Sequence, residues 1–429
     1  MNIKKIGIYI LTIIFLFQNS FVQFTNINIL NNLDELLILF LAVFMFIKIV
    51  KKGKIEKNIS ILFFLVTMFS FIGILSCWLN SDFIFSRVIL SNFLVIKFFI
   101  LIMAICTLEI KEEYRNYIMD ALELCCKLVI IVAIFNFCFP NLYKQIFSFA
   151  MVTKRFNITA ITSLFYHPGR YGWFMLFMSI FYYSKYKNSK SNKDKGWMMI
   201  CALFSVLSLR TKVIMSIIVI IIFECIINKK INIKKIIISL VILSTVMLVF
   251  RNVIWNTYSL YYTDTNGVSA RQALNHYSIK IMKDYFPLGV GFGKYGSWYA
   301  KVYYSEYYYK YNMNTVYGLS PQFSSFATDT FWPSIIGETG LCGTFIYILC
   351  LLVLIFSLLK KRKKMSTSSI WVNIAILSLI QAICESFGEP SFNSAPQNIF
   401  VALSIGLALS ERVDKENGEN QNNSNNSNL

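Results

Sequence analysis

The chain has 429 residues, of which 56% are hydrophobic and only 15% are charged, and its mean hydropathy is +0.57. This leaves too little polar surface to solvate a compact fold in water, so the composition excludes an ordinary soluble enzyme and predicts an all-α polytopic membrane protein. Lys and Arg number 41 against 22 Asp and Glu, a formal charge of +19. In a soluble protein this excess would indicate nucleic acid, but in a membrane protein the topology must account for it first.

Twelve mostly apolar runs approach the length of about 20 residues that a transmembrane helix needs. They lie near 6–24, 33–50, 59–79, 88–108, 118–139, 170–184, 197–209, 213–228, 236–250, 331–358, 369–388 and 397–411. The first run resembles a signal peptide but lacks a small-residue cleavage site, so we take it as the first span. The expected organisation is nine spans in 1–250, a long loop at 251–330, three spans in 331–411 and a tail at 412–429.

Basic residues gather in alternate connections between these runs, for example at Lys51–Lys57, Lys229–Lys235 and Lys360–Lys364. Because Lys and Arg concentrate in cytoplasmic loops, both termini are expected in the cytoplasm and the number of spans is expected to be even. The basic runs are therefore interpreted as topology signals, and no nucleic-acid partner is expected. The Asn-rich tail 412–429 is expected to be disordered.

The predicted loop 251–330 holds 14 of the 24 tyrosines and more basic than acidic residues. Aromatic rings with polar tips suit the membrane interface and stack on sugars, and basic side chains suit a phosphate-bearing partner. Segment 269–284 has an amphipathic helical pattern, with Leu274, Ile279 and Ile281 among polar positions. We expect it to lie along the membrane surface.

Four basic residues are candidates for binding a diphosphate. Arg210 and Lys212 stand in the tight connection LSLRTK, Arg170 stands in HPGRYGWFM, and Arg271 belongs to the long loop. A guanidinium group offers a planar fork of donors that matches phosphate oxygens. The alternative for Arg210 and Lys212 is interfacial snorkelling, in which the long side chains only reach for water.

The segment DTFWPSIIGETGLCG at 329–343 places two carboxylates at the start of an apolar run. Asp329 is either an interfacial cap or a general base for a sugar hydroxyl, and Glu338 is either a buried partner for an arginine or a substrate contact. Gly340 and Gly343 permit close helix packing. His276 and Tyr277 of the loop helix are further candidates for substrate binding.

Other features have structural interpretations. GFGKYG at 291–296 fits G-x-G-x-x-G but follows no strand, so its glycines indicate a tight turn, with a diphosphate nest as the alternative. Glu123 and Lys127 are four residues apart and are expected to pair. Lys97 has no evident partner in sequence.

Taken together, these motifs resemble the bacterial O-antigen polymerase and O-antigen ligase superfamily of integral-membrane glycosyltransferases. In the ligase branch the end of the outer loop has a histidine where this chain has Asp329, whereas the spacing to Gly340 and Gly343 is kept. This difference favours the polymerase branch. The likeness covers about residues 150–410 and is carried by HPGRYGWFM (167–175), LSLRTK (207–212), Arg271 with PLGVGFGKYG (287–296), and DTFWPSIIGETGLCG (329–343).

The resemblance implies a GT-C-like enzyme on the outer face of the cytoplasmic (inner) membrane. Its substrates would be an undecaprenyl-diphosphate-linked oligosaccharide and an acceptor glycan, with a chain-length regulator as a further partner and no metal or other cofactor. Arg210 and Arg271 would engage the carrier diphosphate, and Asp329 would lie near the acceptor. The product would be O-antigen, capsule or exopolysaccharide. The alternatives are a ligase that transfers glycan to lipid A-core and a lipid-linked oligosaccharide transporter.

Overall fold

The computed structural model describes residues 3–52, 57–80, 83–155, 158–227, 269–365 and 369–411, together with Arg251 and Trp255. Over these residues the chain is helical, with a single two-stranded hairpin, which confirms the all-α class. The elements in chain order are α1 (Ile3–Leu16), α2 (Gln18–Thr25), η1 (Asn28–Asn32), α3 (Leu33–Lys52), α4 (Lys57–Leu79), α5 (Phe85–Leu108), α6 (Glu112–Cys138), α7 (Pro140–Ile146), β1 (Lys154–Arg155), β2 (Ile158–Thr159), α8 (Pro168–Ser189), α9 (Asn192–Val206), α10 (Thr211–Ile227), α13 (Ala270–Asp284), α14 (Trp298–Val302), α15 (Glu306–Lys310), η3 (Met313–Thr315), α16 (Trp332–Lys364), α17 (Ile370–Glu385) and α18 (Gln397–Ser410).

Three helices are long and apolar enough to cross a bilayer, namely Ile59–Leu79 of α4, α5 and α16. The bent pair α1 and α2 would add a fourth, and α17 and α18 are apolar but shorter. The described residues thus form a membrane protein with fewer clear spans than the twelve predicted runs. One reason is length, because α9 has 15 residues and α10 has 17, short of the about 20 that a span needs. Run 236–250 and tail 412–429 lie outside the described residues.

The predicted first span, 6–24, is not one straight helix. It bends by 70° between α1 and α2. The cause is polar: Gln18 Nε2 donates to the carbonyls of Leu30 (2.9 Å) and Asn31 (3.0 Å), and Asn19 Nδ2 donates to the carbonyl of Ala395 (2.8 Å). These contacts turn α2 toward the start of α3 and the residues before α18.

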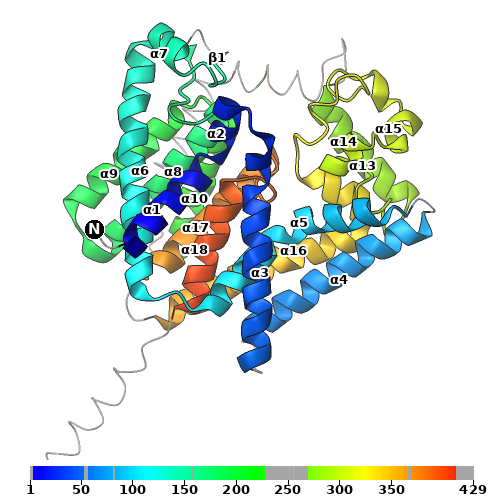
Figure 1. The fold of residues 1–429 in the computed structure, drawn as a ribbon, viewed down its shortest axis with the longest axis horizontal. Coiled ribbons are helices and arrows are strands. Elements are labelled where there is room, and N and C mark those ends of the chain that lie inside the picture. Colours follow the sequence, from blue (N-terminus) through cyan, green and yellow to red (C-terminus); the bar gives the residue numbers. More distant parts are fainter. Residues whose placement is uncertain are drawn as a thin grey trace, which may run out of the picture.

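Two groups of helices surround the site. Figure 1 shows α8, α10, α17 and α18 together on one side, where α17 packs on α8, α10 and α18. On the other side α16 packs on α4, and α18 reaches α5. The helices α13, α14 and α15 gather beside α16 around their own apolar cluster, which includes Leu274, Ile281, Tyr295 and Tyr308.

The expected helix at 269–284 is confirmed as α13. It begins at Ser269, whose hydroxyl accepts the amide of Gln272, and it buries Leu274 and Ile281. Ile279, expected on the same face, is 48% exposed instead. The buried face of α13 packs against α16. Its expected position along the membrane surface stays a prediction.

The expected pairing of Glu123 with Lys127 is wrong, and Lys97 finds its partners in another helix. Glu123 forms its ion pair with Lys185 of α8 rather than with Lys127. Lys97 of α5, which has no evident partner in sequence, lies 2.8 Å from Asp34 and 3.2 Å from Glu35 of α3. The partners are 62 and 63 residues away, so only tertiary packing brings them together.

Candidate functional site

His167 begins α8 and has a defined hydrogen-bonding role. Its Nδ1 accepts the amide of Gly169 at 3.0 Å, which caps the helix. Burial, aided by the positive charges of Arg210 and Lys212, lowers the pKa of His167 to about 3. The ring is therefore neutral at physiological pH, and since Nδ1 is an acceptor, the proton sits on Nε2.

Arg210 meets His167 from the turn between α9 and α10. Its Nη2 lies 3.5 Å from His167 Nε2 and 3.2 Å from Thr153 Oγ1. Because Nε2 carries the ring proton, Nη2 and Nε2 are both donors, and they lie 3.5 Å apart. Two donors that converge at a helix N-terminus suit an anionic oxygen.

The turn that presents Arg210 is held by the short hairpin. Arg155 of β1 donates to the carbonyl of Leu209 at 3.1 Å, and the amide of Ile161 donates to Leu207 at 3.2 Å. Leu209 has φ 53°, a left-handed conformation that turns the chain sharply into α10. The predicted tight connection LSLRTK is therefore confirmed and is braced from outside its own helices.

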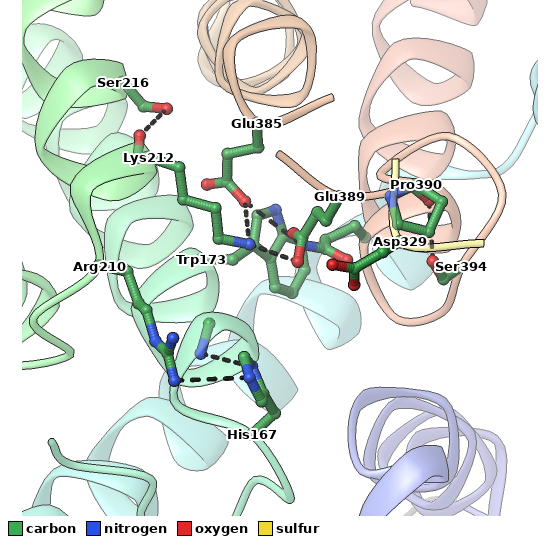
Figure 2. A network of polar contacts seen from close by, with 12 residues as sticks. His167, Trp173, Arg210, Lys212, Ser216, Asp329, Glu385, Glu389, Pro390 and Ser394 are labelled. Carbon is green, nitrogen blue, oxygen red and sulfur yellow. Dashed lines mark hydrogen bonds and ion pairs between the residues drawn. The ribbon is translucent and has the colours of Figure 1, made fainter. Parts of the chain in front are cut away.

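Lys212 is engaged by carboxylates. Its ammonium contacts Glu389 and lies 3.7 Å from Glu385 at the end of α17 (Figure 2). Burial alone would raise the pKa of Glu389, but Lys212 and Arg170 outweigh it and hold this pKa well below its usual range. Lys212 thus joins α10 to the α17–α18 connection instead of standing as an isolated cation.

Arg170, in the first turn of α8, lies near the same carboxylate. Its Nη1 is buried and has no hydrogen-bond partner among the described residues. A buried polar atom of this kind normally has a partner, so this guanidinium retains donor capacity beside Arg210 and Lys212. The structure therefore brings together three of the predicted site residues, Arg170, Arg210 and Lys212.

Arg271 and Asp329 form a second pair. Arg271 Nε donates to Asp329 Oδ2 at 2.6 Å, and both side chains are about one-third exposed, at 34% and 37%. The pairing joins the first turn of α13 to the residues before α16. Sequence reasoning nominated both residues but did not predict their contact.

The other two candidates on α13 lie apart from the α8 cluster. His276 is exposed and meets Tyr277 edge-on, with ring centroids 5.0 Å apart. Tyr277 packs in turn on Tyr311 at 5.6 Å. Both residues belong to the tyrosine-rich surface of α13–α15. They take no part in the charged cluster at the start of α8.

Glu338 differs from the expected substrate contact, because its carboxylate is used internally. It is 1% exposed, accepts the amide of Tyr295 at 3.0 Å and the hydroxyl of Ser297 at 2.5 Å, and also accepts backbone hydrogen bonds from Gly293 and Lys294. The GFGKYG segment does form an anion nest, and its occupant is the chain's own carboxylate.

A break in α16 completes this arrangement. Gly340 has φ 60° and ψ −157°, and the carbonyls of Gly337 and Glu338 accept the amides of Val290 (3.0 Å) and Gly291 (2.8 Å). A Cβ at Gly340 would lie 2.4 Å from the amide nitrogen of Gly289. The predicted close packing at Gly340 is confirmed, with a loop rather than a helix as the partner.

A partly open cavity of about 190 Å³ lies beside residues 328–330 and the α17–α18 connection. Its lining includes Pro390, which follows Glu389, and Thr328 and Thr330, which flank Asp329. Figure 2 shows Glu389, Pro390 and Asp329 on the same side of Lys212. This volume is smaller than the about 300–1,000 Å³ that is typical of drug-sized ligand sites.

Several residues of this site were missed from sequence. The motif HPGRYGWFM was noted for Arg170, yet the capping role of His167 depends on where α8 begins. Glu389 carries no pattern of its own, and its pairing with Lys212 joins positions 177 residues apart. Lys97 was recognised as unusual, but its partners were not.

No protein-family model matches this chain, and no curated protein is significantly similar to it.

Proposed function

We propose that this chain is a polymerase that joins undecaprenyl-diphosphate-linked oligosaccharide repeat units into O-antigen, capsular or exopolysaccharide chains. The observation that carries the proposal is the convergence of His167 Nε2–H and Arg210 at the N-terminus of α8, with Arg170 beside them. A diphosphate presents several oxygens to such donors and gains from the positive end of the helix dipole.

The proposed enzyme is a GT-C-like protein of the cytoplasmic membrane with about twelve spans. The distribution of Lys and Arg supports cytoplasmic termini and an outward-facing site. The resemblance of the four motifs to O-antigen polymerases and ligases supports the same class of substrate. A chain-length regulator is an expected partner.

The reaction proposed is a single displacement with inversion. A hydroxyl oxygen at the non-reducing end of one lipid-linked unit forms a bond to the anomeric carbon of the growing chain. The bond from that carbon to the carrier diphosphate breaks, and its electron pair leaves with the diphosphate. The hydroxyl proton passes to the carboxylate of Asp329.

Each charged group has a part in this scheme. Arg210, with His167, stabilises the charge that develops on the leaving diphosphate, and such preorganised donors are worth about 10²–10³-fold in rate each. Arg271 holds Asp329 at 2.6 Å and carries a second positive charge beside the proposed general base. The tyrosines of α13–α15 would keep the two sugar chains in register.

The test is gel analysis of surface polysaccharide after deletion of the gene and complementation. Arg210→Ala, Arg271→Ala and Asp329→Ala should each give glycan limited to a single repeat unit, with normal amounts of protein in the membrane. Lys283→Ala, an exposed cation on the same helix as Arg271, is the matched control and should restore long chains.

Other outcomes would reject the polymerase. Full-length glycan that accumulates on the lipid carrier in the deletion strain would identify a ligase. Loss of all outward-facing glycan would identify a transporter. Long chains of normal length in both arginine variants would exclude the proposed diphosphate site.

A further inference from the structure

The cavity beside residues 328–330 has features that the proposed diphosphate site does not use. Seven of its thirteen lining residues carry a hydroxyl or amide side chain, among them Ser297, Thr328 and Asn393. A lining of this kind suits a ligand rich in hydroxyl groups.

An aromatic ring stands at the same cavity. Trp298, the first residue of α14, lines it and is 52% exposed, although the ammonium of Lys301 lies 5.2 Å from its ring centroid. A half-exposed indole beside hydrogen-bonding groups suits a sugar ring, which presents apolar C–H faces and polar edges.

The charge of the cavity is opposite to that of the α8 cluster. Glu35 is the only ionisable residue in its lining, over the part of the chain that the structure describes. Glu35 shares Lys97 with the buried Asp34, so one ammonium faces two carboxylates and the group has a formal charge of −1. Gln18 also donates to Asp34, at 3.2 Å.

From these observations we infer that the cavity is the binding site for the terminal sugar of the acceptor, and that it selects neutral or amino sugars over acidic ones. The inference rests on the proposed function for the identity of the acceptor. Trp298 contacts the ring, the hydroxyl and amide side chains of the lining bind its hydroxyls, and Glu35 repels a uronate or a phosphorylated sugar. The cationic and anionic parts thus keep the diphosphate and the acceptor in separate places.

The experiment uses the full chain in lipid nanodiscs, because detergents with sugar headgroups would compete. Saturation-transfer NMR compares methyl glucoside, glucosamine and methyl glucuronide as probes. For the wild type, the glucoside and glucosamine should saturate, with the glucuronide weaker by about tenfold at low salt.

Two variants locate the binding site. Trp298→Ala should abolish saturation of the glucoside, whereas Tyr317→Ala, another exposed ring of the same segment, should leave it unchanged. Glu35→Gln should raise glucuronide binding to the level of the glucoside, whereas Glu306→Gln, at an exposed carboxylate, should not. Lys97 keeps Asp34 as a partner in Glu35→Gln, so this variant retains the buried ion pair.

Equal binding of all three probes by the wild type, or unchanged binding in Trp298→Ala, would overturn the inference. Binding of inorganic pyrophosphate to the same samples reports on the proposed function separately, with Arg210→Ala as the variant. Pyrophosphate binding that depends on Arg210 without sugar binding would reject only the cavity. Sugar binding with pyrophosphate binding that is unchanged in Arg210→Ala would reject only the diphosphate site.

Discussion

Two regions of this protein offer backbone and side-chain donors to an anion, and they differ in what meets those donors. In the segment 293–297 the amides of Gly293, Lys294 and Tyr295 and the hydroxyl of Ser297 all bind Glu338, which is 1% exposed. At the start of α8, His167 Nε2 and Arg210 Nη2 are 3.5 Å apart and are both donors. The donors of segment 293–297 bind the chain's own carboxylate, so this region has a structural role. The donors at the start of α8 suit an anionic ligand.

The largest effect on folding is expected at the break in α16, which packs against the glycine-rich loop. Gly340→Ala should prevent folding, because φ 60° with ψ −157° is accessible almost only to glycine and a Cβ would meet the backbone of Gly289 at 2.4 Å. Loss of the protein from the membrane fraction and of its cooperative melting transition would show this. Gly196→Ala in α9 is the control, since nothing lies within 4 Å of its Cβ, and it should stabilise by up to about 1 kcal/mol. A folded Gly340→Ala protein would mean that the break in α16 is not required.

At the proposed ligand site the change should appear in activity with little change in stability. His167→Asn keeps a side chain that caps α8 but removes the Nε2–H donor. The rate of polymerisation should therefore fall by about 10²-fold, while the melting temperature stays near that of the wild type. Polymer formed from lipid-linked repeat units by the purified protein is the measurement. Wild-type activity in this variant would leave His167 with its capping role alone.

Acid should destabilise the protein through His167. Its pKa is about 3 in the folded protein, against about 6.5 in an unfolded chain, so between these values the unfolded state binds the additional proton. The contribution of His167 to stability is present above pH about 6.5 and is lost as the pH falls toward 3. Melting temperatures measured from pH 7 to pH 4 should fall further in the wild type than in His167→Asn. Parallel curves would show that this histidine is not buried as described.

The smallest effect on stability is expected at the ion pair between Arg271 and Asp329. Both partners are about one-third exposed, so their coupling should be below about 1 kcal/mol in a double-mutant cycle of Arg271→Ala and Asp329→Ala, measured by thermal unfolding. Loss of glycan in these variants would then reflect chemistry and not misfolding. A coupling of several kcal/mol would instead mean that the ion pair is needed for the stability of the fold.

Local patterns predicted part of this site. Apolar periodicity located α13, the turn LSLRTK and the start of α16, and residue chemistry selected Arg170, Arg210, Arg271 and Asp329. The patterns did not predict that Lys212 pairs with Glu389 or that Glu338 fills the glycine loop, because these partners are 177 and about 43 residues apart. Contacts of that kind depend on how the helices pack, and the local sequence pattern does not show which helices pack together.

What the sequence determined by itself is the membrane class and the positions of most helices, since a bilayer demands apolar runs whose backbone groups are paired within the segment. It also placed basic and aromatic side chains before the last group of helices. The tertiary structure decided which charges are neutralised internally and which donors converge. The physical reason is that burying a charge costs free energy unless a partner lies within reach, and the partner of Lys97, Lys212 or Glu338 comes from a distant part of the chain.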